Sequence, residues 1–423
     1  MPRPLKLFLQ IVVAVAVSAS VSVIAISLIF SKTFIENMTF FTPPFEVATA
    51  DAAQRLMAPV MPAVDPSIDP QAAAIQYRAF LPIWNPEGRG ATHPAVRKVP
   101  ILPFAWTQLA EDRTLFPDAR TGNRLDRSKL IATLGRRLTP EERATLANVA
   151  EDSLWRDFDR LARAVRFDVA AGSFTFPLDP AHSAFDLPIP RLNRLNELAD
   201  GVALRALHFA TTGRRDSSEA AFGALYAIGL RTQEGALSLI EALLGQRLAL
   251  ASIELRRALH EAAPRPGSDA IVASALSIRQ ANDSARQARR TRSAARDSSA
   301  ERPDARAYLL DRAGDSTESR ALRVELLGLI GYTSCGSLKE LFFGPSERLR
   351  AIRDDALATL AYSAADSAYF RYLEAQTTEA TVGLYGGTWF DRIVRGTGSA
   401  LSTVTTNPRF RACTDAIAAA QSY

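Results

Sequence analysis

The sequence predicts a mainly α-helical protein that one N-terminal helix attaches to a membrane. Residues 7–30 contain no charged side chain, which is typical of a membrane-spanning helix. Between residues 139 and 262, apolar residues recur at the spacing of amphipathic helices. One stretch, residues 165–176, alternates with the period of a strand. We therefore expect a single transmembrane helix, an irregular proline-rich strap and a helical-hairpin domain with at most one short β-hairpin.

The composition is that of a folded protein of moderate size. Of the 423 residues, 47% are hydrophobic and 22% are charged. This balance is ordinary for a globular protein and too apolar for a fully disordered chain. The presence of only two cysteines excludes a disulfide-dense scaffold. At about 100–200 residues per domain, the length predicts roughly two folded units besides the anchor and linkers.

The net charge is +5, from 50 lysine and arginine residues against 45 aspartate and glutamate residues. Acidic residues are interspersed with the basic ones, whereas a nucleic-acid-binding surface needs basic residues gathered on one face. We therefore expect no nucleic-acid partner. The excess of arginine over lysine and the abundant alanine are typical of a biased coding genome, and we expect a bacterial protein.

Residues 7–30 are long enough to cross a bilayer as a helix, since a helix rises about 1.5 Å per residue and the hydrocarbon core is about 30 Å thick. In lipid, a helix satisfies every backbone polar group internally. Arg3 and Lys6 precede the run and only Lys32 closely follows it. The positive-inside rule therefore predicts that residues 1–6 stay in the cytoplasm. We expect a single-pass inner-membrane protein whose remaining chain is periplasmic.

A cleaved signal peptide is the alternative to this signal anchor. Residues 17–19 (Val-Ser-Ala) could serve as a cleavage site, but the chain stays apolar through residue 30, unlike a mature N-terminus. We therefore predict an uncleaved anchor. Four phenylalanines beyond it suit the membrane interface and could equally pack into the exported domain: Phe34, Phe40, Phe41 and Phe45.

Residues 31–113 form the predicted membrane-proximal strap. Proline is frequent along it, and proline removes a backbone donor and interrupts regular elements. Short helices are predicted around residues 50–56 and 70–80. Trp84 and Trp106 indicate that the strap packs on the helical domain, because a solvated linker seldom carries tryptophan.

The helical domain is predicted at residues 114–262. Residues 139–142 (Thr-Pro-Glu-Glu) form a capping box that begins a helix with proline in its first turn. The predicted β-hairpin insertion follows near residues 165–176. The apolar residues after the capping box recur at helical spacing: Leu146, Val149, Leu154, Trp155, Phe158 and Leu161.

Three further helices are predicted between residues 192 and 259. Gly213 ends the first, and residues 216–219 (Asp-Ser-Ser-Glu) are predicted to cap the N-terminus of the second. Small residues in the second helix favour close antiparallel packing. The stripe of the first helix consists of Leu195, Leu198, Val202, Ala206 and Phe209.

The first two of these helices resemble a tetratricopeptide hairpin. The matching positions are Leu204, Leu207, Ala220, Ala224 and Ala227. The chain departs from that family at His208, Thr211 and Thr232, where the family has glycine, an aromatic residue and proline, and it shows no second copy of the repeat. We therefore expect a generic helical hairpin rather than membership of the family.

Residues 263–304 are predicted to be a linker or a surface excursion, followed by a C-terminal helical part at residues 305–423. The linker carries a basic run that either contacts anionic lipid headgroups or an acidic partner, or is a solvated, partly helical loop. The run consists of Arg286, Arg289, Arg290, Arg292 and Arg296.

Cys335 and Cys413 are the two cysteines of the chain. With the predicted topology both lie in an oxidising compartment, where a disulfide is expected. Such a bridge would tie the C-terminal helix to the rest of the domain. The alternative is two buried thiols that act as small apolar residues.

No catalytic, cofactor-binding or metal-binding residues are predicted. The four histidines are too far apart in the sequence to chelate a metal from one helix: His93, His182, His208 and His260. The chain contains no nucleophile elbow, phosphate-binding loop or dinucleotide fingerprint. Glu234 and Glu241 share a helix side in the predicted pattern, but that spacing is common on solvated faces.

The expected function is that of an exported helical scaffold or interaction protein, or an accessory subunit of an envelope or integral-membrane complex. Its partners would be the bilayer, through residues 7–30, and a protein in the membrane or periplasm. One alternative is an envelope enzyme that uses carboxylates, for example on cell-wall glycans. The other is a helical domain that binds lipid or a small molecule. The fold class alone does not choose among these.

Overall fold

The computed structural model of the chain describes residues 47–82, 95–107, 112, 114–121, 124–178, 192–297, 358 and 361–372. These residues belong to two compact units. The larger contains the described residues up to Asp283 together with 358 and 361–372, and the smaller contains residues 284–297. Helices make up nearly all of the regular structure in the described part, which confirms the mainly α fold class.

Two helices lie in the segment predicted to be the strap. Helix α2 (Val47–Met57) continues into the 3-10 turn η1 (Ala58–Val60), and helix α3 (Pro70–Phe80) follows. The side chain of Asp69 caps α3 by accepting from the backbone N of Ala72 at 2.8 Å. The short helices predicted at residues 50–56 and 70–80 are therefore confirmed.

The strap contributes to the hydrophobic core of the larger unit. Trp106 is fully buried, and its ring stacks at 4.8 Å on Phe104 on one side and on Trp155 of the helical domain on the other. Its indole N–H donates to the backbone O of Glu197 at 2.6 Å. Trp106 thus packs on the helical domain as its residue type predicts, whereas Trp84 lies outside the described residues.

The structure places its short strand pair away from residues 165–176. Strands β1 (Arg120–Thr121) and β2 (Arg124–Leu125) are antiparallel, with Arg120 opposite Leu125. They follow the 3-10 turn η2 (Pro117–Ala119) and precede helix α5 (Arg127–Ala132) and turn η3 (Thr133–Gly135).

The β-hairpin predicted near residues 165–176 is wrong. Helix α8 (Val169–Ser173) occupies the middle of that stretch, because the side chain of Asp168 caps it by accepting from the backbone N of Ala171. Phe174, just beyond the helix, forms an isolated antiparallel bridge with Val96 of the strap. The end of this stretch, residues 173–175, therefore pairs with residues 95–97 of the strap instead of forming a local hairpin.

The predicted capping box is confirmed at the start of helix α6 (Pro140–Ala150). Glu142 N donates to Thr139 Oγ1 at 3.1 Å, and Thr139 N donates to Glu142 Oε2 at 2.9 Å. The apolar stripe beyond it is buried as expected, but it belongs to two helices. Helix α7 (Leu154–Ala162) begins after a turn in which the side chain of Asp152 accepts from the backbone N of Leu154.

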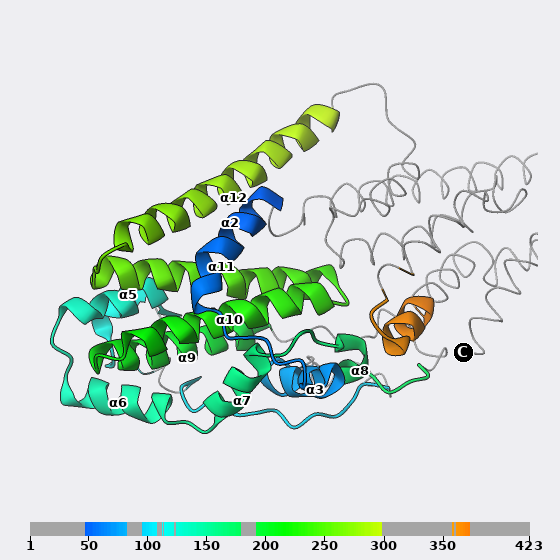
Figure 1. Ribbon diagram of the computed structural model, residues 1–423, viewed down its shortest axis with the longest axis horizontal. Coiled ribbons are helices and arrows are strands. Elements are labelled where there is room, and N and C mark those ends of the chain that lie inside the picture. Colours follow the sequence, from blue (N-terminus) through cyan, green and yellow to red (C-terminus); the bar gives the residue numbers. More distant parts are fainter. Residues whose placement is uncertain are drawn as a thin grey trace, which may run out of the picture. The chain divides into compact units, whose positions relative to one another are not determined.

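Helices α9 (Leu192–Thr211), α10 (Arg215–Gly235) and α11 (Leu239–Ala262) form the hairpin stack (Figure 1). The expected stripe of α9 is buried, and Gly213 in the turn to α10 adopts a φ of +77°, which a residue with a side chain rarely takes. At the crossing of α10 and α11, a Cβ on Gly245 would lie 2.5 Å from the backbone O of Gly229. Glycine therefore allows these two helices to touch through their backbones, as the small residues predict.

Helix α12 (Ser268–Asp297) occupies most of the segment predicted to be a linker or surface excursion. This range contains neither proline nor glycine and is rich in alanine and arginine, which are strong helix formers. Within the larger unit, α12 buries a narrow stripe and exposes most of its other residues. The stripe consists of Ser268, Ala275, Ile278 and Asn282.

Several sequence predictions concern residues outside the described part. These are the transmembrane anchor at residues 7–30, the interfacial Phe34, Phe40, Phe41 and Phe45, and the disulfide between Cys335 and Cys413. No helix among the described residues combines the length and the apolar character that crossing a membrane requires.

Candidate functional site

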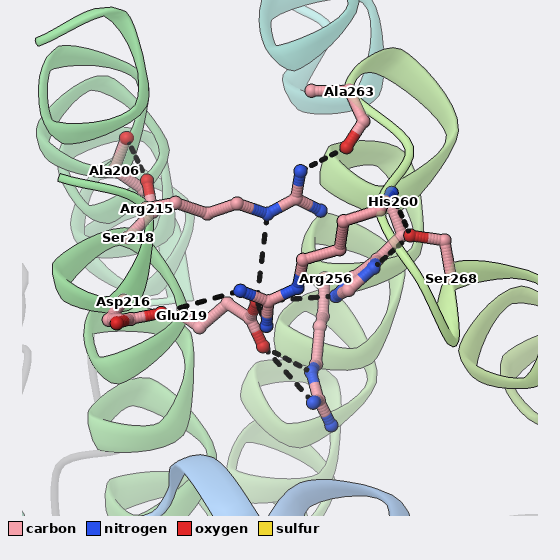
Figure 2. A network of polar contacts seen from close by, with 10 residues as sticks. Ala206, Arg215, Asp216, Ser218, Glu219, Arg256, His260, Ala263 and Ser268 are labelled. Carbon is pink, nitrogen blue, oxygen red and sulfur yellow. Dashed lines mark hydrogen bonds and ion pairs between the residues drawn. The ribbon is translucent and has the colours of Figure 1, made fainter. Parts of the chain in front are cut away.

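Glu219 is the centre of a buried network of charged side chains on helix α10 (Figure 2). Its side chain is 3% exposed, and Arg256 of α11 donates to its Oε2 atom from both Nε, at 3.2 Å, and Nη2, at 3.1 Å. Figure 2 shows both donors of Arg256 directed at the same carboxylate oxygen. A forked, charge-assisted contact of this kind fixes the relative orientation of the two helices.

The other carboxylate oxygen, Oε1, is contacted by three more side chains. Arg265, in the connection between α11 and α12, pairs with it and also lies 3.3 Å from Asp216. His260 Nε2 is 3.4 Å from Oε1, and Arg215 Nε is 3.7 Å from it. Three guanidinium groups therefore converge on one buried carboxylate.

His260 and Ser268 complete this network. The Ser268 hydroxyl accepts from the backbone N of Arg265 at 2.9 Å and lies 2.8 Å from His260 Nδ1. The Ser268 hydroxyl therefore links the imidazole of His260 to the backbone of Arg265, while Nε2 on the other side of the ring faces Glu219. Burial lowers the pKa of His260, and the nearby Arg215 and Arg256 add to this effect against the opposing influence of Glu219.

The same residues also bind backbone carbonyls of neighbouring elements. Arg256 donates to the carbonyl of Leu56 in α2, and Arg215 donates to that of Ala263 at the end of α11. On the other side of α10, the hydroxyl of Ser218 donates to the carbonyl of Ala206 in α9. Through these bonds the network joins α2, α9, α10, α11 and the start of α12.

The N-terminal cap predicted at residues 216–219 is wrong. Helix α10 already begins at Arg215, and its N-cap residue, Arg214, makes no side-chain capping bond. Ser218 and Glu219 are buried and bind partners on other helices, so these contacts outweigh the local preference of serine and acidic residues for a cap.

The Glu219 network acts as a clamp, that is, its ion pairs and hydrogen bonds hold neighbouring helices together. Both oxygens of Glu219 already accept from cationic groups, which leaves this carboxylate unsuited to act as a base or a nucleophile. Burial, and next the charge of Arg265, lower the pKa of Arg215. A buried ion pair of this kind contributes little net stability, but removing one partner is costly because it leaves the others uncompensated.

A second buried carboxylate, Glu241 of α11, joins α11 to α3. Arg78 Nη1 lies 2.7 Å from its Oε1 atom, and the Tyr77 hydroxyl donates to the same oxygen at 3.0 Å. Arg78 also donates from Nε to the Ser173 hydroxyl of α8 at 2.7 Å. Burial, and next the charge of Glu241, raise the pKa of Tyr77 far above its usual range. Glu241, like Glu219, therefore makes contacts that hold separate helices together.

Glu234 and Glu241, considered together as a carboxylate pair, lie on different helices. Glu234 is on the last turn of α10, exposed and paired with Arg231 at 2.9 Å, whereas Glu241 is buried in α11. The break between the two helices at residues 236–238 separates them. The geometry gives no reason to treat them as one site.

Two of the four histidines, His208 and His260, lie in the described part of the chain. His208 is an ordinary residue of α9, with a pKa lowered mainly by burial. His260 belongs to the Glu219 network, which the sequence analysis missed. His93 and His182 lie outside the described residues. Within the described ranges, no three histidine, cysteine or acidic side chains are grouped so that they could hold a metal ion.

One signal in the sequence could have revealed the network. Glu219 lies three residues before Phe222 and seven before Tyr226, on the face of α10 that is otherwise apolar. A charged residue in such a stripe requires a buried partner. The sequence does not indicate which of its many arginines supplies it.

No known protein family, curated protein or solved structure matches this chain.

Proposed function

We propose that this protein is a membrane-anchored, exported helical scaffold that binds a protein partner in an envelope or integral-membrane complex. The observation that supports this function most is that the buried charged side chains join helices to one another. Glu219 and Glu241 each join helices from separate parts of the sequence, and both carboxylates are occupied by cationic or hydroxyl donors. Contacts of this kind hold helices in a rigid arrangement, which suits a scaffold better than a catalytic site.

The uncharged residues 7–30 supply the proposed anchor, with Arg3 and Lys6 before them and Lys32 after them. The proposed localisation is the inner membrane, with residues 1–6 in the cytoplasm and the helical unit in the periplasm. A scaffold needs to be held at the membrane and to present a surface, and the anchor meets the first need.

Helix α12 is the proposed surface for the protein partner. The Glu219 network fastens its first turn through Ser268, while few of its residues up to Asp283 are buried. Leu276, on the outer side of this helix, is 39% exposed. A helix that is firmly held at one end and open along its length is suited to binding another protein.

The proposal is tested with a photoreactive amino acid placed at Ser277 of α12 in the full chain and activated in native membranes. A discrete cross-linked protein is expected at this position. The matched control is the same residue at Glu141, which is exposed on α6. An equal pattern of adducts at both positions, or none at Ser277, would contradict the proposed role of α12.

A further inference from the structure

The outer side of helix α7 carries a cluster of exposed arginines. Arg156, Arg160 and Arg163 are spaced four and three residues apart, which places them on one side of the helix, and Arg166 follows in the next segment. All four are exposed. The opposite side of α7 is buried in the core through Leu154, Trp155, Phe158 and Leu161. We call these four arginines the α7 basic patch.

Few acidic groups neutralise the α7 basic patch. Asp65 pairs with Arg163 at 3.5 Å. Asp159, although it is part of α7, is held by Arg205, whose two terminal nitrogens donate to its two oxygens at 2.8 and 2.7 Å. Within the described ranges, Arg156 and Arg160 form no ion pair. The half-buried Asp157 is the only other acidic residue of α7, so the patch keeps a surplus of positive charge.

Exposed apolar side chains border the same arginines. Val64 is 48% exposed, Val165 42% and Tyr362 40%. Val64 lies beside the patch because the backbone N of its neighbour, Asp65, donates to the carbonyl of Arg163 at 2.8 Å. Tyr362 lies beside it because the Arg166 guanidinium is 5.5 Å from the centre of its ring. Large exposed apolar residues are few in the described part of the chain, and three of them adjoin this one patch.

We infer that the α7 basic patch binds the surface of an anionic phospholipid bilayer, with Val64, Val165 and Tyr362 entering the interface. Guanidinium groups bind phosphate through two parallel hydrogen bonds, and basic groups are attracted to anionic lipid within a Debye length of the surface. An aromatic ring and aliphatic side chains beside such groups are the residues that enter the headgroup region.

This inference rests on the proposed function, because the anchor is what keeps the patch near the bilayer. The sixteen residues between the end of the anchor and α2 (31–46) extend at most about 55 Å. This limit applies to the start of α2, and the folded unit that carries the patch is tethered there, so the patch meets the membrane at a high effective concentration and modest contacts suffice. An acidic protein would need to match isolated apolar side chains on a convex helix, whereas a bilayer adapts to them.

The test uses the full chain reconstituted into vesicles of phosphatidylcholine alone or of phosphatidylcholine with phosphatidylglycerol. A photoreactive amino acid replaces Val165, and lipid adducts are quantified by mass spectrometry. We expect several-fold more adducts in the anionic vesicles than in the neutral ones, with the excess lost in high salt. The same label at Leu276, on α12, measures background that should not depend on lipid charge.

The double variant Arg156→Gln/Arg160→Gln should lower the adduct yield at position 165 several-fold. Its matched control is Arg137→Gln/Arg247→Gln, which removes the same charge from exposed positions elsewhere. Equal losses in both double variants would overturn the inference, since net charge and not the patch would then govern the effect. Protein adducts in native membranes in place of lipid adducts would overturn it in favour of an acidic protein.

Release of the chain from the vesicles distinguishes failure of the proposed anchor from failure of this inference. Release of the full chain from both kinds of vesicle in high salt would overturn the proposed anchor, and the inference that depends on it would fall with it. Retention of the chain, with a yield at position 165 that does not depend on lipid charge, would overturn this inference alone.

Discussion

His260 Nδ1 lies 2.8 Å from the Ser268 hydroxyl, and this contact joins the last turn of α11 to the first residue of α12. Ser268 in turn accepts from the backbone N of Arg265, whose side chain reaches Glu219. The imidazole of His260 and the side chain of Glu219 therefore connect the start of α12 to the hairpin stack.

We expect the protein to lose stability as the pH falls below about 6.5, the usual pKa of histidine. The pKa of His260 is lowered in the folded chain, so the unfolded chain binds the proton more tightly and acid favours unfolding. The groups facing the ring are Glu219, Arg215, Arg256 and Ser268.

Thermal denaturation between pH 5.5 and pH 7.5 measures this effect. The variant His260→Gln should show a smaller dependence on pH across the window than the natural chain. His208→Gln is the comparison variant: the pKa of His208 is also lowered, mainly by burial, so this variant measures how much of the pH dependence comes from a histidine outside the network. An identical pH dependence in the natural chain and in His260→Gln would contradict the prediction.

Replacing Glu219 with glutamine should destabilise the protein by about 3–5 kcal/mol, because it leaves the buried guanidinium groups without their charge partner. Urea denaturation measures the change in the free energy of unfolding. The control is Glu234→Gln, whose exposed pair with Arg231 should be worth less than about 1 kcal/mol. Comparable losses in the two variants would show that the network is not a clamp.

Local sequence patterns predicted the local structure well. The capping box at Thr139 and Glu142, the stripe of α9 and the helix at residues 70–80 depend on residues within a turn or two of each other, and the structure contains all three. In these three elements, interactions between neighbouring residues agree with the fold, whereas at residues 216–219 contacts with other helices outweigh the local preference for a cap.

Features that depend on distant residues were not predictable in the same way. Phe174 pairs with Val96 and not with a strand partner nearby, which removes the expected hairpin. Glu219 gathers side chains from α10, α11 and the connection to α12, and Arg256 extends the network to α2. One-dimensional spacing carries no information on which of many arginines reaches a given carboxylate.

Replacing Gly245 with alanine should destabilise the stack of α10 and α11 by about 1–3 kcal/mol, as expected for overpacking of a close contact. The added Cβ would lie 2.5 Å from the backbone O of Gly229, so the two helices must separate. Gly135→Ala is the control, because nothing lies within 4 Å of a Cβ at that position. A thermal melting temperature that is equally affected in both variants would argue against the contact.

Cys335 and Cys413 are expected to form a disulfide in the exported protein, as the only two cysteines of the chain. Labelling of free thiols in the unfolded, unreduced protein should find none, whereas the reduced protein should label at both positions. Replacing either cysteine with serine should cost about 2–4 kcal/mol of stability. Two labelled thiols without reduction would exclude the bridge.

The orientation of the chain is the last expectation, and it depends on the charges around residues 7–30. Arg3 and Lys6 before this run, with only Lys32 close after it, favour a cytoplasmic N-terminus. A reporter that is active only after export, fused behind Tyr423, should therefore be active, and a reporter that works only in the cytoplasm should be silent there.

Charge changes give this topology experiment its control. The double substitution Arg3→Glu/Lys6→Glu reverses the bias and should reduce the activity of the exported reporter. Lys98→Glu/Arg137→Glu makes the same change in charge at exposed positions far from the run and should not. N-terminal sequencing of the mature chain completes the test, since a start near Ser20 would indicate a cleaved signal peptide in place of an anchor. Activity of the cytoplasmic reporter in the unmodified fusion would show the opposite orientation. Cys335 and Cys413 would then lie in the cytoplasm, where a disulfide is not expected.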